Sequence, residues 1–280
     1  MMQISRAAYY RKPMKEKMQL RRDMDLRGAI DRIHLEFPGY GYRRIRAQLL
    51  REGKRVNSKR IKRVMRRYSL FSCLKKFFKA RGQAMGKQLV FPNLIRGLKV
   101  SGPNQIWATD ITFVKLLHEY IYVSAVIDVY TRKIVGWSVS RDLSHKFCLE
   151  ALEVAIKKYK PPKGVIHHSD RGVQYCCDAY VEYLEQHGFK ISMSKVGTPE
   201  DNAYIESFFK TMKREEVYVK RYETMRDVIE NLPAFIDEVY NKKRLHSSLG
   251  YKSPSEFERE VMKLKPAKRP VLKIWGHAVS

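Results

Sequence analysis

The sequence predicts an α/β fold, a mixed sheet of five strands flanked by helices, behind a small basic all-helical unit. Residues 106–141 contain three short segments rich in Val, Ile, Tyr and Trp, and helical and strand patterns alternate over 144–216. Residues 1–100 carry 28 Lys and Arg against 6 Asp and Glu, whereas the other 180 residues carry 28 against 23. This asymmetry places a basic module before a near-neutral domain.

The basic module shows the pattern of three helices. Apolar residues recur at helical spacing over 14–37, and the sequence "FPGYGY" then interrupts the helix. A second helix follows over 43–52, and Asn57 or Ser58 is placed to cap a third helix over 59–70. Two short helices joined by a Gly-containing turn, with the second rich in Arg and Lys, are typical of a helix-turn-helix.

This composition favours nucleic acid as the partner of residues 1–70. Within the third helix, Arg60, Lys62 and Arg63 are candidate DNA contacts. A solvated basic face, a membrane-surface helix or a small basic bundle without a DNA-binding role are the alternatives. We expect residues 71–104, which are basic and lack periodicity, to form a linker.

Neither secretion nor membrane insertion is expected. The N-terminus has no apolar signal region, and no apolar stretch approaches the ~20 residues that a membrane-spanning helix needs. We therefore expect a soluble, cytoplasmic protein. None of the four cysteines lies in a C-x-x-C pair, so reduced thiols are expected and no zinc site.

The second domain, residues 105–222, is expected to begin with strands over 106–114, 119–131 and 133–141. A helix over 144–159, a strand ending at "HHSD", another helix, the strand "KISMSK" and a final helix over 202–216 follow. Two antiparallel hairpins followed by alternating helices and strands predict a mixed sheet covered by helices. We expect residues 223–280 to form a largely helical extension and tail.

Three acids lie on three different predicted elements. Asp110 is in the middle of the first strand, Asp170 follows a later strand, and Glu206 lies one turn into a helix. A carboxylate among apolar neighbours is costly to bury unless it is paired or bound to metal. Two Mg²⁺ ions about 3.5–4 Å apart activate the attacking and leaving oxygens of a phosphodiester, and Mg²⁺ prefers carboxylate oxygens. The three acids are therefore candidate catalytic residues and ligands of two ions.

The motifs "WATDIT", "HSDRG" and "GTPEDNAYIESFFKTMKRE" carry a family resemblance. They resemble the three motifs of DDE transposases related to retroviral integrases, and the 35 residues between Asp170 and Glu206 match that family's spacing. The segments 40–65 and 241–257 are similar to one bacterial branch, the second-reading-frame proteins of the insertion-sequence-three family. The resemblance covers roughly residues 3–258. It implies an RNase H-like fold, Mg²⁺ or Mn²⁺ dependence and DNA strand transfer.

Further residues of these motifs are candidates for DNA binding, each with a structural alternative. Lys213 lies two helical turns after Glu206, on the same face. His168 is expected to orient Asp170 or to contact DNA, and Arg171 to contact phosphate or form a surface ion pair. Asn202 is expected to cap the glutamate helix or to contact substrate. Other acids of the same region, Asp128, Glu200 and Asp201, are expected in turns and caps.

The resemblance also implies partners. The first reading frame of such elements supplies a further DNA-binding and dimerising part, so a partner protein and a homo-oligomer are expected, along with the terminal repeats and target DNA. The two-His, two-Cys zinc module of retroviral integrases is absent, since residues 1–100 hold only His34 and Cys73. The alternatives are a DNA-binding regulator with a vestigial RNase H-like domain and a simple RNase H-type nuclease. A tyrosine recombinase is disfavoured, because Arg244 and His246 lack the other residues of its site.

Overall fold

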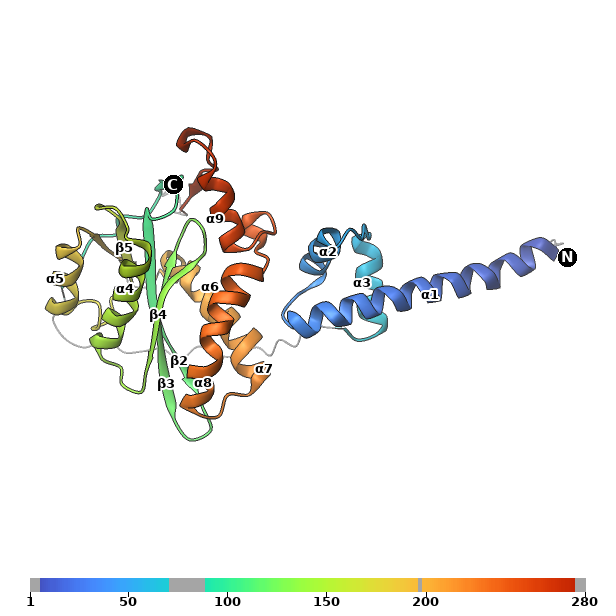
Figure 1. Cartoon of the computed structure of the whole chain (residues 1–280), viewed down its shortest axis with the longest axis horizontal. Coiled ribbons are helices and arrows are strands. Elements are labelled where there is room, and N and C mark those ends of the chain that lie inside the picture. Colours follow the sequence, from blue (N-terminus) through green and yellow to red (C-terminus); the bar gives the residue numbers. More distant parts are fainter. Residues whose placement is uncertain (1–5, 71–88, 196–197, 275–280) are drawn as a thin grey trace. The chain divides into compact units, whose positions relative to one another are not determined.

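The computed structural model describes residues 6–70, 89–195 and 198–274 (Figure 1). The chain forms two compact units, Met1–Lys76 and Phe77–Ser280. Each unit has its own buried core, so each is described by itself.

The first unit consists of the helices α1 (Arg6–Glu36), α2 (Tyr42–Arg51) and α3 (Ser58–Arg67). The side chain of Asn57 accepts a hydrogen bond from the backbone N–H of Lys59, as its predicted capping role requires. Apolar residues from all three helices form the core: Leu26, Ile30, Ile33, Ile45, Leu49, Ile61, Val64 and Met65. The short α2 and α3, packed on the end of a longer helix, confirm the predicted helical unit.

The second unit contains a five-stranded sheet with the order β4-β3-β2-β5-β6. β2 pairs antiparallel with β3 and β3 with β4, while β5 is parallel to both β2 and β6. The strands are β2 (Ile106–Lys115), β3 (Tyr120–Asp128), β4 (Ile134–Ser140), β5 (Ile166–Ser169) and β6 (Lys190–Met193). This arrangement confirms the predicted mixed sheet.

Helices cover both faces of this sheet (Figure 1). One face packs against α4 (His145–Tyr159) and α5 (Asp178–Gln186), and the other against α6 (Ala203–Met212) and α8 (Met225–Ala234). Gly136 of β4 permits the close approach of α4, because a Cβ atom there would lie 2.1 Å from the carbonyl oxygen of Ala151. Alternation along β2 places Trp107 on the α4 side and Ala108 on the α6 side.

The C-terminal extension shares the core on the α6 side of the sheet. Its Asn241 side chain donates to the carbonyl oxygen of Ile134 and accepts from the N–H of the same residue, which ties the extension to β4. A π-helical segment at Lys213–Val217 and α7 (Tyr218–Lys220) lead into the extension, which contains α8, a π-helical segment at Phe235–Lys243, 3-10 turns at Ser247–Leu249 and Pro266–Lys268, and α9 (Pro254–Met262). Residues 225–262 are mostly helical, in agreement with the largely helical extension expected over residues 223–280.

The predicted linker 71–104 is wrong at its C-terminal end. Residues 71–88 lie outside the described residues, but Ile95 is buried and Asn93 donates to the Asp201 carboxylate. In addition, β1 (Lys99–Val100) pairs with β7 (Leu272–Lys273) in a two-stranded sheet. Residues 93–100 are therefore part of the second unit, held by contacts with segments about 100 or more residues away in the sequence.

None of the helices in the described ranges combines the length and apolar character needed to cross a membrane.

Candidate active site

Strand register brings Asp110 and Asp170 together. β2 and β5 run parallel with Ala108 opposite His168, and each aspartate lies two residues further along its chain. Side chains two residues apart point to the same face, and neighbouring strands lie about 4.8 Å apart. Both aspartates therefore lie near the end of β5, Asp110 on the Ala108 side of β2 and Asp170 one residue past β5, and the charges of both act on the buried Tyr175.

Glu206 lies on α6, the helix that packs against the Ala108 face of the sheet. Its helix is fixed to β2 because the Asn202 side chain donates to the carbonyl oxygen of Thr109, at 3.1 Å, one residue before Asp110. This contact corrects the prediction for Asn202: its side chain makes no capping hydrogen bond, since a 3-10 turn at Pro199–Asn202 leads into α6. Asn202 is also buried, which leaves little surface for a substrate.

The surroundings of Asp170 disfavour its charged form. Desolvation by the surrounding protein raises the pKa of this carboxyl, although part of its residue surface reaches solvent, and a hydrogen bond from the Gly172 N–H opposes the rise. The buried Tyr175 lies near both aspartates, since the charges of Asp110 and Asp170 both contribute to the raised pKa of its hydroxyl, after desolvation. A cation at this place would relieve the electrostatic cost of two adjacent carboxylates.

Lys213 also reaches this part of the sheet. Its ammonium group lies 4.6 Å from the centroid of the Phe113 ring, and burial lowers its pKa to about 8 while the Asp110 charge opposes that change. The residue starts a π-helical segment at the end of α6. This π-helical segment is held by a buried, bidentate ion pair. Nε and Nη2 of Arg244 each donate to one carboxylate oxygen of Glu215, both at 2.7 Å.

The predicted DNA contact by His168 is wrong. The side chain has no exposed surface, and its ring nitrogens are hydrogen-bonded to the hydroxyls of Ser192 and Ser194. Burial lowers the pKa of His168 to about 4, and burial with the neighbouring imidazole lowers that of His167 to about 3. Both rings are neutral parts of the core near pH 7, and His168 ties β5 to β6.

Of the remaining candidate residues, Arg171 stays partly exposed, whereas Asp128 and Asp201 make hydrogen bonds within turns. Arg171 is half-buried and donates to the carbonyl oxygen of Ser194, so only part of its guanidinium is available to DNA. Asp128 accepts from the N–H and hydroxyl of Thr131, which confirms its predicted turn role. Asp201 accepts from Thr198 and Asn93, again in a turn.

In the first unit, α3 exposes a basic surface. Lys62 is exposed and packs its ammonium over the Tyr42 ring at 4.2 Å. Arg60 and Arg63 instead donate to the carboxylate of Asp23, which is only 1% exposed. Asp23 was not among the predicted functional residues. A single acid in a polar helical segment does not indicate, from the sequence alone, that it pairs with arginines 37 and 40 residues away.

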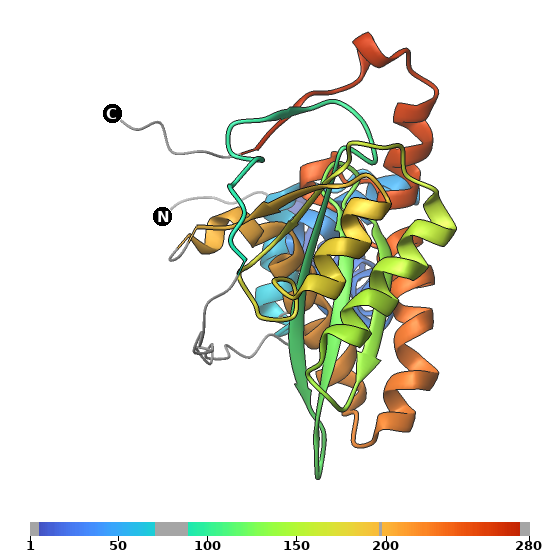
Figure 2. The same ribbon diagram turned by 90° about the vertical axis from the view of Figure 1, so that its left-hand side faces the viewer.

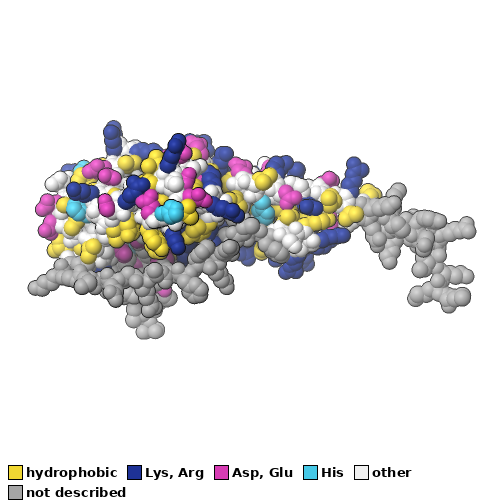
Figure 3. Space-filling model, turned by 90° about the horizontal axis from the view of Figure 1, so that it is seen from below, with side chains coloured by type: hydrophobic (Ala, Val, Ile, Leu, Met, Phe, Trp, Pro, Cys, Tyr) yellow, Lys and Arg dark blue, Asp and Glu magenta, His cyan; other side chains and the backbone are white. Residues whose placement is uncertain are grey.

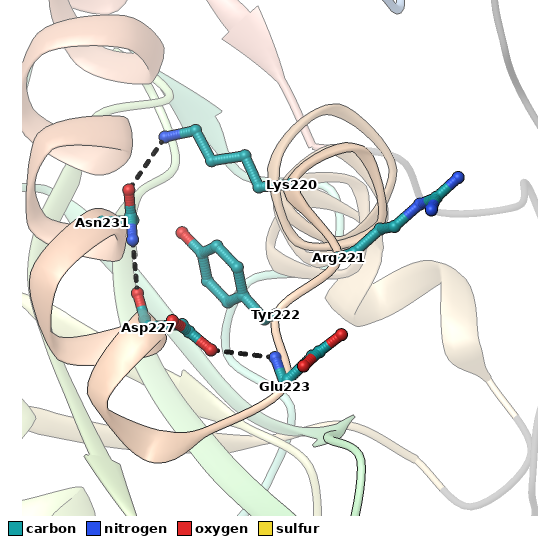
Figure 4. Close-up of a pocket in the computed structure, with 6 residues that line it drawn as sticks. All are labelled: Lys220, Arg221, Tyr222, Glu223, Asp227 and Asn231. Atoms are coloured by element: carbon teal, nitrogen blue, oxygen red, sulfur yellow. Dashed lines mark hydrogen bonds between the residues drawn. The ribbon is translucent and has the colours of Figure 1, made fainter.

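No three His, Cys, Asp or Glu side chains in residues 6–70, 89–195 and 198–274 are grouped closely enough to hold a metal ion as they stand. Glu206 lies 3.8 Å from the Lys210 ammonium in an ion pair. A shallow pocket elsewhere in the second unit contains none of the three acids (Figure 4). It is lined by Lys220, Arg221, Tyr222, Glu223, Asp227 and Asn231.

The fold is that of an integrase-like catalytic core, preceded in the sequence by a helix-turn-helix-like unit. Models of the integrase core domain match residues 100–199 and 187–254, and a model of an HTH-like domain matches residues 21–77. The chain is 36% identical over 252 residues, 89% of its length and 98% of the relative, to the transposase for insertion sequence element IS904 of Lactococcus lactis.

Two further relatives show the same relationship. The chain is 35% identical over 79% of its length to transposase InsF for insertion sequence IS3A of Escherichia coli, covering 77% of that protein. It is 34% identical over 92% of its length to an insertion element IS600 protein of 31 kDa from Shigella sonnei, covering 96% of it. The chain belongs to the IS3 family of DDE transposases, and it is a DNA-acting polynucleotidyl transferase with an RNase H-like core.

Solved retroviral integrases are more distant. An HTLV-2 integrase catalytic core in complex with magnesium is 16% identical, with a TM-score of 0.45, and the match covers 58% of this chain and 99% of that one. A simian T-cell lymphotropic virus intasome chain is 15% identical, with a TM-score of 0.48, over 84% of this chain and 76% of that one.

Proposed function

We propose that this transposase cleaves DNA at the ends of its insertion sequence and joins the resulting 3′-OH to a second phosphodiester, with Asp110, Asp170 and Glu206 as the catalytic acids. The observation that supports this proposal is the β2–β5 register, in which Ala108 is opposite His168 and an aspartate follows two residues later on each segment. The anchoring of α6 by Asn202 supports the same assignment for Glu206.

The donor set fits a hard divalent cation. The three candidate ligands are carboxylates, which suit Mg²⁺ or Mn²⁺, whereas imidazole suits softer metals; the nearby His167 is hydrogen-bonded through Nε2 to Tyr180, and His168 to Ser192 and Ser194. Two such ions would supply charge stabilisation for the attacking and leaving oxygens. The free thiols Cys148, Cys176 and Cys177 take no part in this proposal, which needs no zinc.

In this proposal, basic residues of both units bind DNA, those of the first unit at the terminal repeats and those of the second unit near the reacting bond. We assign the exposed Lys62 to the phosphates of the terminal repeats, with Arg60 and Arg63 fixing α3 through Asp23. Lys213 and Arg171 flank the catalytic acids and are assigned to phosphates near the reacting bond. The helix-turn-helix-like unit, residues 1–70, thus recognises DNA that residues 105–222 cut and join.

Two DNA ends must be processed together for an element to move, so we propose that the active form is at least a dimer. A protein from the first reading frame of the element, fused or as a separate partner, would add further DNA recognition. In this proposal all three acids of one catalytic centre belong to one chain.

The test uses full-length protein, labelled terminal-repeat DNA and Mg²⁺. Joined products that exceed the substrate in length support strand transfer. Nicked products alone would indicate a nuclease, and binding without either product would indicate a DNA-binding regulator with an inactive core.

A further inference from the structure

Beyond the catalytic acids, β2 has an open edge. β5 pairs with Ile106–Ala108 only, whereas β3 pairs with β2 as far as Lys115. The β2–β3 hairpin therefore projects from the sheet past the end of β5, as the turned view shows (Figure 2). Side chains on this projection lie next to the candidate centre but outside the pairing that forms it.

Two aromatic rings are exposed on the hairpin. Phe113 of β2 is 41% exposed and Tyr120 of β3 is 53% exposed, and their centroids lie 6.0 Å apart with planes at 63°. They lie close because Lys115 is opposite Tyr120 and Phe113 is opposite Tyr122. Exposed aromatic surface of this kind commonly marks a place where a partner binds.

Lysines lie over both rings. The Lys213 ammonium is 4.6 Å from the Phe113 centroid and the Lys115 ammonium is 6.0 Å from the Tyr120 centroid. The nearby carboxylate of Glu119 is paired with Arg141, at 2.7 Å. Seen from below, the molecule presents hydrophobic side chains interspersed with Lys and Arg and with Asp and Glu (Figure 3). The matching partner carries both negative charge and flat apolar surfaces.

We propose that Phe113 and Tyr120 form a stacking platform for an unpaired base of the DNA strand at the reaction centre, with Lys213 and Lys115 on its phosphates. Stacking on aromatic side chains beside a basic surface is a general mode of single-strand binding. Phe113 is three residues beyond Asp110, roughly 10 Å along an extended strand, and the odd spacing turns the two side chains to opposite faces of β2, so the DNA strand would pass the open edge of β2 between them. That distance corresponds to about three stacked nucleotides. The proposal rests on the assignment of Asp110 to the catalytic centre.

The test is a binding experiment with the full chain in Ca²⁺, so that it does not depend on catalysis. The probe is duplex DNA whose end carries three unpaired bases, one of them 2-aminopurine, compared with the blunt duplex. Wild type should quench the fluorescence of the unpaired probe. Phe113→Leu should lose the quenching and bind the unpaired DNA about 5- to 100-fold more weakly. Phe113→Trp should restore both signals.

Matched measurements separate stacking from other roles. Val154→Ala, which removes a similarly exposed apolar side chain from α4, should behave as wild type, and all variants should unfold at similar temperatures because the altered residues are exposed. Equal loss for blunt and unpaired DNA would overturn the platform, and so would unchanged binding by Phe113→Leu. Loss of self-association with intact DNA affinity would show instead that the rings bind a second copy.

The same experiment distinguishes the platform from the proposed catalytic function. Asp170→Asn should keep the quenching by Phe113 and lose strand transfer. If the wild type quenches the probe but never joins DNA, the proposed strand transfer fails and the platform stands. If the wild type joins DNA without any quenching, the platform fails and the catalytic assignment stands.

Discussion

Asp110 and Asp170 occupy equivalent positions on neighbouring parallel chain segments, each two residues beyond the pair formed by Ala108 and His168. The pairing joins segments 60 residues apart in sequence, and the charges of both acids act on the buried Tyr175. In the absence of metal, their proximity and the raised pKa of Asp170 make the site an unfavourable place for two negative charges.

Metal should therefore stabilise the fold. At 100 times its Kd, Mn²⁺ binding contributes about 2.7 kcal/mol, which raises Tm by several degrees in a protein of this size. Asp170→Asn should shift less across the same Mn²⁺ titration, because one ligand charge is missing. Asp142→Asn, which alters an exposed acid after β4, is the matched control and should shift like the wild type. Identical shifts for all three proteins would exclude Asp170 as a ligand in the absence of DNA.

Lys213 should make DNA binding sensitive to pH. Burial lowers its pKa to about 8, so its ammonium is charged at pH 7 and largely neutral at pH 9. Affinity for DNA at low salt should therefore fall more steeply over this range for the wild type than for Lys213→Arg, whose guanidinium stays charged. Parallel pH profiles measured by fluorescence anisotropy would show that Lys213 does not contact DNA.

The buried His167 should weaken the fold in acid. Its folded pKa of about 3 lies below the unfolded value of about 6.5, so the unfolded state binds the proton first. The stability contributed by this histidine is complete above about pH 6.5 and is lost as the pH falls toward 3, by up to roughly 1.4 kcal/mol per pH unit. Urea unfolding of His167→Gln at pH 7 and pH 5 should show a smaller difference than the wild type. A difference as large as that of the wild type would contradict the assignment.

The exposed lysines and arginines of α3 should govern the salt dependence of duplex binding. Replacing Lys59, Lys62, Arg66 and Arg67 with Ala should flatten the plot of log affinity against log salt by about 0.9 for each phosphate that is no longer neutralised. Lys146→Ala and Lys157→Ala, which remove exposed charges from α4, are the control. If the control flattens the slope as much as the α3 variant, net charge rather than α3 controls binding.

Local patterns were sufficient to predict the elements that carry the acids. Period-two alternation placed Asp110 on the Ala108 face of its strand, and helical spacing placed Glu206 on a helix, as the structure shows. The register between β2 and β5 could not be predicted, because strand pairing over 60 residues depends on the whole sheet. The assignments of the three acids themselves stay predictions until they are tested.

Tertiary contacts account for the predictions that were wrong. His168 lies two residues before a catalytic candidate, but it is buried and hydrogen-bonded to Ser192 of β6 and to Ser194 just after it. Asn202 stands at the N-cap position of α6, but a 3-10 turn already precedes the helix there. The side-chain amide of Asn202 instead donates to the carbonyl oxygen of Thr109. Asn93 lies in a stretch without periodicity, and its partner Asp201 is 108 residues away. None of these partners has a signal in the local sequence.

The most direct test of the account is strand transfer by variants of the three acids. Asp110→Asn, Asp170→Asn and Glu206→Gln should each reduce joining of terminal-repeat DNA by a factor on the order of 10² to 10³ or more, with DNA binding and Tm retained. Glu200→Gln, which alters an exposed acid near the same helix, should join DNA at the wild-type rate. Near-normal joining in Mg²⁺ by any one of the three variants would contradict the proposed catalytic centre.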